Sequence, residues 1–167
     1  EIVYQRIREI SKSLVPVEIN TLGLKLSLQS IIQNVSQASD KKGQLKFDYN
    51  VDVDFDVDVD VDVDNCIIHF VQEALNNIIK HSEATEFLVT VSKDYKSSTI
   101  VVSDNGIGFP EGSINNINYK NQNGLGLLRI RERINKLGGN FSIESNQIYK
   151  TNLIAKIPAG RGTYEEY

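Results

Sequence analysis

The sequence predicts an α+β fold in which helices cover one face of a mixed β-sheet. Several stretches place apolar residues three and four positions apart, as helices do, and several others alternate with the period of two that is typical of strands. The two kinds of stretch do not alternate strictly along the chain, which disfavours a purely parallel α/β sheet. The length of 167 residues fits one domain, and a hydrophobic content of 40% excludes a disordered tail.

The first two predicted elements are helices. The apolar stripe of the first lies in residues 1–14, and we expect Pro16 to end it; its members are Val3, Ile7, Ile10 and Leu14. Either this helix packs on its own domain or it is the end of a dimerising helix. A second helix begins near Asn20 or Thr21 and runs to Ala38, although residues 22–28 also alternate like a strand.

An unusual acidic repeat follows. Residues 51–64 read VDVDFDVDVDVDVD and hold seven of the 22 acidic residues. Together with the stretch from Leu45 they predict a strand with one apolar face and one anionic, mostly exposed face. Without the seven aspartates, 18 basic residues face 15 acidic ones, so the net charge of -4 is a local property and no nucleic-acid-binding profile results. A calcium loop is disfavoured because the repeat lacks the glycine and final glutamate of such loops.

Two helices and four strands complete the prediction. A third helix is capped by Asp64 or Asn65 and runs from Cys66 to about His81. The elements after it are strands at 87–93 and 99–103, a Gly- and Asn-rich loop at 104–123, a helix at 126–137, and a hairpin of strands at 140–145 and 151–157.

The composition also bounds the cellular setting. A single cysteine excludes a disulfide framework and suits a reducing compartment. The absence of methionine, with Glu1 as the first residue, indicates a fragment, and no stretch has the length and apolarity of a membrane span. We expect a cytoplasmic domain, and an upstream membrane anchor in the intact protein stays open.

Three polar motifs contain residues that are suited to catalysis or ligand binding. The third helix has a polar stripe in which Glu73 and Asn77 lie one turn apart; the stripe comprises His69, Glu73, Asn76, Asn77 and Lys80. Asp104-Asn-Gly-Ile-Gly108 follows an apolar strand, and Asn123-Gly-Leu-Gly-Leu127 leads into a helix whose free N–H groups suit phosphate. Separately, each is also explained by a solvated helix face, a tight turn or an ordinary helix start.

Together, the order and spacing of these motifs resemble the ATP-binding domain shared by gyrase, the heat-shock chaperone, histidine kinases and the mismatch-repair ATPase, a Bergerat-type α/β sandwich. Three stretches are similar to sensor histidine kinases of the nitrate-sensor and lipid-desaturation type: residues 71–81, 104–109 and 124–139. The resemblance implies a remnant of a dimerisation helix and linker at 1–20 and an ATP-binding domain at 21–158. Residues 159–167 follow Pro158 and lie outside this fold, so we expect either a tail of the protein or residues that cloning adds.

The resemblance also implies roles for the polar residues. Asn77 would coordinate Mg²⁺, Glu73 would polarise the attacking group or its water, and Lys80 and His81 would face the phosphates of ATP. Glu73, Asn77 and Lys80 are the implied catalytic residues. Asp104 would accept from the adenine amino group, and the remaining implied ATP contacts are Gly106, Gly108, Gly124, Leu125, Gly126, Leu127 and Thr151.

Two departures from the family pattern matter. The last glycine box, GxGT, keeps Thr151 but has Tyr149 and Lys150 where small residues are expected. The only histidines, His69 and His81, lie on the ATP-binding helix, so the phosphoacceptor histidine is absent. The resemblance therefore implies a kinase domain that acts on a histidine of its own dimerisation helices, in a homodimer, for relay to a response regulator. The alternatives are an anti-sigma-factor-type serine kinase and a degenerate nucleotide-binding scaffold.

Overall fold

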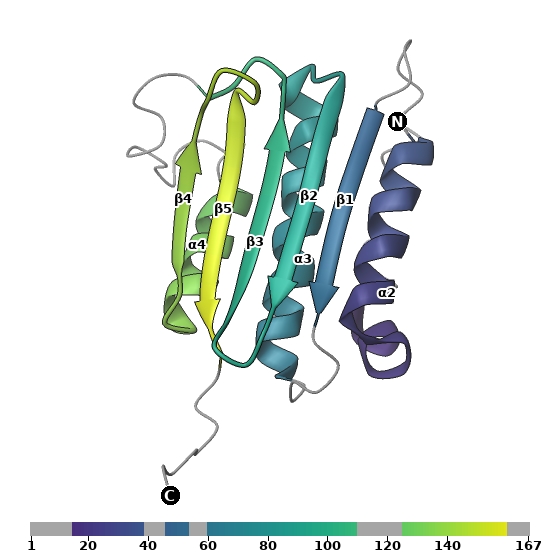
Figure 1. Ribbon diagram of the computed structural model, residues 1–167, viewed down its shortest axis with the longest axis vertical. Coiled ribbons are helices and arrows are strands. Elements are labelled where there is room, and N and C mark those ends of the chain that lie inside the picture. Colours follow the sequence, from purple (N-terminus) through teal and green to yellow (C-terminus); the bar gives the residue numbers. More distant parts are fainter. Residues whose placement is uncertain (1–14, 39–45, 54–59, 110–124, 160–167) are drawn as a thin grey trace, which may run out of the picture.

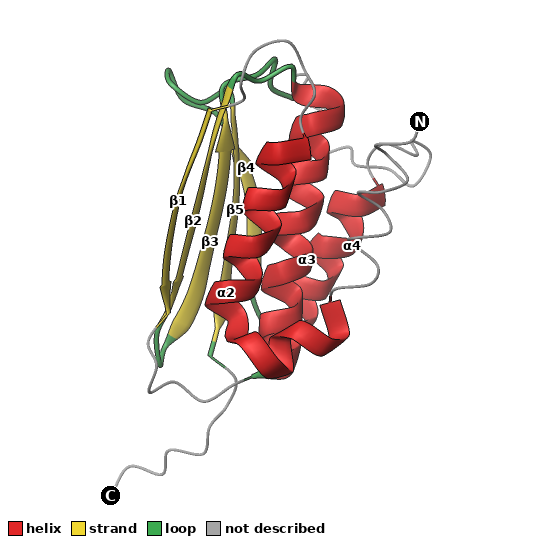
Figure 2. Cartoon of the chain, turned by 90° about the vertical axis from the view of Figure 1, so that its right-hand side faces the viewer, coloured by secondary structure: helices red, strands yellow, loops and turns green. Residues whose placement is uncertain are grey.

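The computed structural model describes residues 15–38, 46–53, 60–109 and 125–159. These residues form two layers, a β-sheet and a set of helices that covers one of its faces (Figures 1 and 2). The helix expected at 1–14, most of the loop after Phe109, Gly124 and the tail from Gly160 lie outside the described residues.

The sheet has five strands in the order β1-β2-β3-β5-β4. The strands are β1 (Lys46–Val53), β2 (Glu86–Lys93), β3 (Ser97–Asp104), β4 (Asn140–Glu144) and β5 (Thr151–Pro158). Only β1 and β2 pair in parallel, and the other neighbours are antiparallel. The predicted mixed sheet with helices on one face is therefore confirmed.

The helices are α2 (Val15–Ala38), α3 (Val61–Asn77), a π-helical turn η1 (Ile78–Ser82) and α4 (Leu125–Lys136). The strand-like alternation of residues 22–28 is misleading, because these residues are helical on both sides of a break at Gly23, where φ is 74°. Pro16 lies in the first turn of α2, where proline is tolerated because the N–H group that it lacks would have no helical partner. The helix at 1–14 lies outside the described residues, so its end at Pro16 stays a prediction.

The end of the acidic repeat is helical, so the strand prediction is wrong there. Asp60 is the N-cap of α3, and its carboxylate accepts from the backbone N–H groups of Asp62 and Val63 at 3.1 Å each. The predicted cap at Asp64 or Asn65 is thus four or five residues late. An aspartate satisfies free N–H groups at a helix start and favours the positive end of the helix dipole, which explains why the same repeat can open a helix.

Asp64 differs from the exposed aspartates that we expected along the repeat. Its carboxylate accepts from Lys93 Nζ at 2.6 Å, and the side chains of Asp64 and Lys93 are 4% and 7% exposed. This buried ion pair joins the first turn of α3 to the end of β2. Buried charges need such a partner because removal from water penalises each of them.

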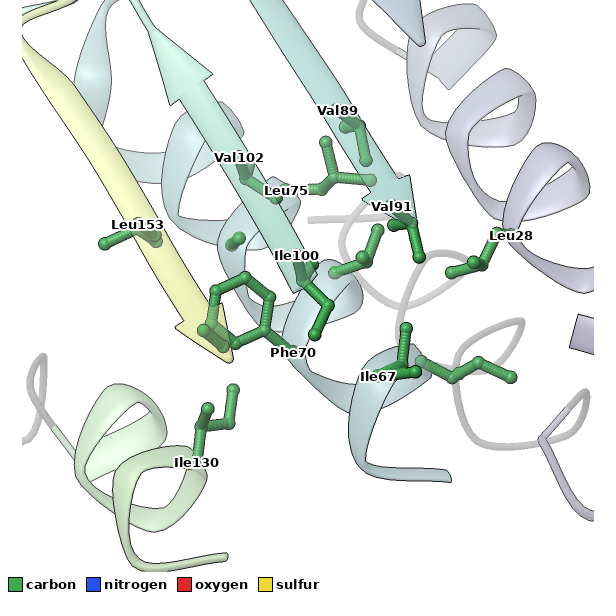
Figure 3. Close-up of a cluster of buried hydrophobic side chains, with 14 of the residues drawn as sticks. Leu28, Ile67, Phe70, Leu75, Val89, Val91, Ile100, Val102, Ile130 and Leu153 are labelled. Carbon is green, nitrogen blue, oxygen red and sulfur yellow. The ribbon is translucent and has the colours of Figure 1, made fainter. Parts of the chain in front are cut away.

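The hydrophobic core lies between the sheet and the helices. In Figure 3, Phe70 and Leu75 of α3 point toward Ile100 and Val102 of β3. Phe70 also meets Phe141 of β4 edge to face, with ring centroids 6.0 Å apart. The core fixes α3 against the middle of the sheet, and this placement brings the polar end of α3 close to the loop that follows β3.

Candidate nucleotide-binding site

The predicted polar motifs meet at one end of the two-layer sandwich. The end of β3, the start of β5, the π turn η1 and the loop after β3 all lie at the upper end of the molecule in Figure 1. The buried pair of Asp64 and Lys93 belongs to the opposite end, where β2 ends and α3 begins. Residues that are far apart in sequence therefore share one surface.

Asp104 is the buried carboxylate of this surface. It is 3% exposed, pairs in register with Thr151, and accepts from the backbone N–H of Gly106 at 2.9 Å. Burial raises the pKa of Asp104, while the hydrogen bonds from Gly106 and from the Thr151 hydroxyl oppose that rise. The result is a buried acceptor that is held in place by two donors, a geometry suited to receive an amino group.

The Gly106–Gly108 loop is held by backbone contacts on two sides. Ile107 N–H donates to the Ser82 carbonyl at 2.8 Å, and a Cβ on Gly106 would collide with that same oxygen. Gly108 has φ +78°, and a Cβ there would lie 3.3 Å from the Lys150 carbonyl. Glycine at 106 is thus required by the protein itself as well as by any ligand.

Two residues that sequence reasoning missed, Ser82 and Asn105, organise this loop. The Ser82 hydroxyl donates to the Ile78 carbonyl at 2.9 Å and accepts from Ala84 N–H at 3.1 Å, which closes the π turn. The Asn105 carboxamide accepts from Thr85 N–H and Glu86 N–H at 3.0 Å each. An Asn next to an Asp in a turn was the only sequence signal for Asn105.

The polar stripe of α3 faces α4 in part, so it is not simply a solvated helix face. Glu73 is half-buried, and its carboxylate contacts Gly126 in the first turn of α4. Asn77 follows one turn later, and its Nδ2 atom is buried without a hydrogen-bond partner in the described part of the chain. Lys80 and His81 are exposed on η1. Burial and the nearby Arg133 lower the pKa of His69.

The structure describes three of the four remaining residues that the resemblance implies as ATP contacts. Thr151 is buried beside Asp104, and Leu125 is half-buried at the first position of α4. Leu127 is 3% exposed and belongs to the hydrophobic core, which gives it a packing role. Gly124 lies outside the described residues.

The altered last glycine box forms an ordered turn. The Asn146 side chain accepts from Ile148 N–H at 2.9 Å and from Tyr149 N–H at 2.7 Å. Asn152 donates to the Glu144 and Tyr149 carbonyls at 3.4 Å. Asparagine side chains therefore shape the turn that glycines would otherwise allow, and Thr151 keeps its place beside Asp104.

Within the described ranges, no three His, Cys, Asp or Glu side chains converge as a metal cage would require. The amide of Asn77 has an unsatisfied buried donor, and its carbonyl oxygen is the kind of hard ligand that Mg²⁺ accepts. Mg²⁺ commonly takes one or two protein ligands and completes its octahedron with phosphate oxygens and water. The residues present fit a magnesium ion that arrives with a nucleotide.

A helix-covered mixed sheet with a buried carboxylate and a glycine-opened helix at one end defines an ATPase-type nucleotide-binding domain. The sequence profile of the histidine kinase-, DNA gyrase B- and HSP90-like ATPase family matches residues 62–163, and the chain belongs to this family. Within the family, its sequence relatives include histidine-protein kinases.

Three similar sequences are signalling proteins. The chain is 31% identical over 88 residues to the nitrate/nitrite sensor protein NarX of Escherichia coli K12, over 53% of this chain and 14% of NarX. It is 32% identical over 92 residues to the histidine-protein kinase/phosphatase DegS of Bacillus subtilis, over 55% of this chain and 23% of DegS. The match to UhpB of Salmonella typhimurium is 38% over 72 residues, or 43% of this chain and 13% of UhpB. The chain thus spans less than a quarter of these relatives.

Solved structures share the fold. The histidine kinase domain of the blue-light activated kinase of Erythrobacter litoralis matches with a TM-score of 0.65 at 21% identity, over 94% of this chain and 75% of that one. The catalytic domain of the histidine kinase ThkA matches with a TM-score of 0.58 at 20% identity, over 82% and 92%. Among the described residues, no helix is long and apolar enough to cross a bilayer.

Proposed function

We propose that this chain is a cytoplasmic domain that binds MgATP and presents the γ-phosphoryl group to a histidine on the dimerisation helices of the intact protein, which is a homodimer. The observation that carries the proposal is the convergence of Asp104, Glu73 and Asn77 at one end of the fold. The ATP-binding unit comprises residues 21–158. A response regulator then receives the phosphoryl group.

The adenine end of the site is built around Asp104. Its carboxylate accepts a hydrogen bond from the exocyclic amino group, and Thr151 and Gly106 hold that carboxylate in place. The backbone of the Gly106–Gly108 loop lies beside the base. This arrangement favours adenine because guanine presents a carbonyl oxygen at the corresponding position, and two acceptors repel each other.

The phosphate end is built from α3, η1 and the start of α4. Asn77 would hold Mg²⁺ through its side-chain oxygen, and the bound ion would neutralise phosphate charge, while Lys80 and His81 on η1 would face the phosphates. The glycine motif at 124–126 would offer backbone N–H groups to phosphate oxygens. Glu73 polarises the attacking group. Phosphoryl transfer relies mostly on such positioning and charge neutralisation, so these few groups suffice for the nucleotide half of the reaction.

Magnesium-dependent ATP binding tests the proposal. We expect calorimetry to give binding at millimolar ATP or below, and Asn77→Ala to weaken it at least tenfold when Mg²⁺ is present, because the metal loses a protein ligand. Without Mg²⁺ the two proteins should differ little. Asn76→Ala is the matched control, since Asn76 is a half-buried neighbour on the same helix. The absence of Mg²⁺-dependent binding by the parent would favour a scaffold module instead.

A pH titration of ATP affinity tests the role of Asp104. Because burial raises the pKa of Asp104, its carboxylate becomes protonated at a higher pH than an ordinary aspartate does. We expect affinity to fall as the pH is lowered through that range, because a protonated carboxyl accepts poorly. Asp104→Asn should weaken binding at least tenfold at neutral pH and flatten this pH dependence.

The same raised pKa fixes the sign of an effect on stability. An acid whose pKa is higher in the folded state adds to the free energy of unfolding at pH values below its unfolded-state pKa of 3.8. That stabilisation is lost as the pH rises through the folded-state pKa. Asp104→Asn should therefore melt at a higher temperature than the parent at pH 7, although it binds ATP worse. An unchanged ATP affinity in Asp104→Asn would contradict the assigned role.

A further inference from the structure

Gly126 and Glu73 are packed so closely that a side chain at position 126 requires Glu73 to move. A Cβ on Gly126 would overlap the Glu73 Oε1 and Cδ atoms and would lie 3.0 Å from Cγ. The nearest obstacles are thus the far end of one flexible side chain, whereas the obstacle at Gly106 is a backbone carbonyl. A methyl group at position 126 can be accommodated if Glu73 moves.

We propose that Gly126 is a positioning residue that seats the Glu73 carboxylate against the first turn of α4. The inference rests on the proposed function, in which Glu73 polarises the group that attacks ATP. It gives the second glycine of the Gly124-Leu-Gly-Leu127 motif a purpose beyond phosphate contact: it leaves the volume that the carboxylate occupies.

The electrostatics of α4 support this arrangement. The first turn of a helix carries partial positive charge, so a carboxylate is favoured there. Asn77 lies one turn beyond Glu73 on the same helix, which places the magnesium ligand and the carboxylate side by side. Glu73 is only half-buried, and no hydrogen bond to its side chain is among those found in the described residues. Contact with Gly126 is therefore a principal constraint on where its carboxylate lies.

The consequence for catalysis follows from the precision that transfer requires. A displacement of the Glu73 carboxylate by roughly 1 Å can lower the rate on the order of 100-fold. The affinity for ATP should change less, because it comes from many contacts with the adenine and the phosphates. Alanine is also the better helix former, by about 1 kcal/mol, so Gly126→Ala need not destabilise α4. The substitution should therefore separate turnover from binding and from folding.

The test compares Gly126→Ala with the double variant Gly126→Ala/Glu73→Asp, in which the carboxylate is shorter by one methylene group. Three quantities are measured: the NMR shift of the Glu73 carboxyl carbon, assigned with Glu73→Gln; the Kd for MgATP; and the turnover, which is the rate of phosphoryl transfer from ATP to dimerisation helices that carry the acceptor histidine and are supplied in trans. Gly138→Ala is the control for a glycine remote from Glu73, because Gly138 lies just past the far end of α4 and a Cβ there meets only Pro158 Cγ, at 3.6 Å. Its φ of +73° makes alanine cost backbone strain of about 1–2 kcal/mol, which affects stability and not the position of Glu73.

We expect Gly126→Ala to shift the Glu73 carboxyl resonance and to lower turnover at least tenfold, with a change of threefold or less in Kd. The double variant should recover at least threefold of the lost turnover, and Gly138→Ala should leave the resonance in place. An unmoved resonance in Gly126→Ala, or a Kd that weakens as much as turnover falls, would overturn the inference. A parent that binds no MgATP would instead overturn the proposed function, while the resonance would still decide whether Gly126 seats Glu73.

Discussion

Gly106→Ala is expected to lower the free energy of unfolding by about 3 kcal/mol, at the upper end of the usual cost of overpacking. The added Cβ would overlap the Ser82 carbonyl oxygen and would lie 2.8 Å from Asp104 Oδ1. Neither the backbone of η1 nor the buried carboxylate can move away freely, because Ser82 also accepts from Ile107 N–H. Thermal unfolding should show a melting temperature lower by roughly 6–12 °C for a domain of this size.

The control for this prediction is Gly23→Ala. Gly23 also has a positive φ, of 74°, but no atom lies within 4 Å of its hypothetical Cβ. With ψ at 164° this is a backbone conformation that almost only glycine adopts, so alanine there should cost backbone strain of about 1–3 kcal/mol without a steric clash. If Gly106→Ala melted at the temperature of the parent, the contact with Ser82 would not be the reason for a glycine at position 106.

Lys93→Met is expected to destabilise the protein by about 3–5 kcal/mol, because it leaves the Asp64 carboxylate buried without its partner. Loss of one member of a buried ion pair is more damaging than loss of both, since a lone buried charge keeps its full desolvation penalty. Urea unfolding at neutral pH measures the effect. Lys156→Met, an exposed lysine on β5, is the matched control and should change stability by less than about 0.5 kcal/mol.

The double variant Asp64→Leu/Lys93→Met separates charge from packing. Apolar residues of similar volume can replace a buried ion pair at little cost, so the double variant should be at least about 2 kcal/mol more stable than Lys93→Met alone. A double variant that is no more stable than Lys93→Met would show that an uncompensated buried charge is not the cause of the loss in Lys93→Met.

Much of the fold was predictable because its elements have local signals. Helix α4 shows a regular apolar stripe and a Gly-Gly stop, and β2 and β3 alternate cleanly around a turn. The meeting of the polar motifs was predictable only through the family resemblance, because nothing local brings residue 73 near residue 126. Their convergence is a property of the strand order, which returns the chain to the same end of the sheet.

The acidic repeat shows where local reasoning failed. Every second residue from 52 to 64 is an aspartate, so the local sequence does not distinguish which aspartate belongs to a strand and which one caps the helix. The position of the cap depends on a contact with a distant residue. When the helix begins after Asp60, Asp64 lies where it can pair with Lys93, which is 29 positions further along the chain. The sequence could not show why positions 106 and 126 are glycine, because the atoms that a side chain would meet belong to other elements.

The π turn η1 gives α3 a change of angular phase. A π turn takes in one residue more than an α turn, which rotates everything after it by about 100° relative to an uninterrupted helix. Glu73 and Asn77 precede the π turn, while the exposed Lys80 lies in its middle and the Ser82 carbonyl that accepts from Ile107 N–H lies at its end. One continuous segment thus contacts the neighbouring helix α4 through Glu73, exposes Lys80 to solvent, and contacts the loop after β3 through Ser82. Deletion of a single residue from η1 would rotate the residues after the deletion by about 100° relative to Glu73, so these contacts could not all form together.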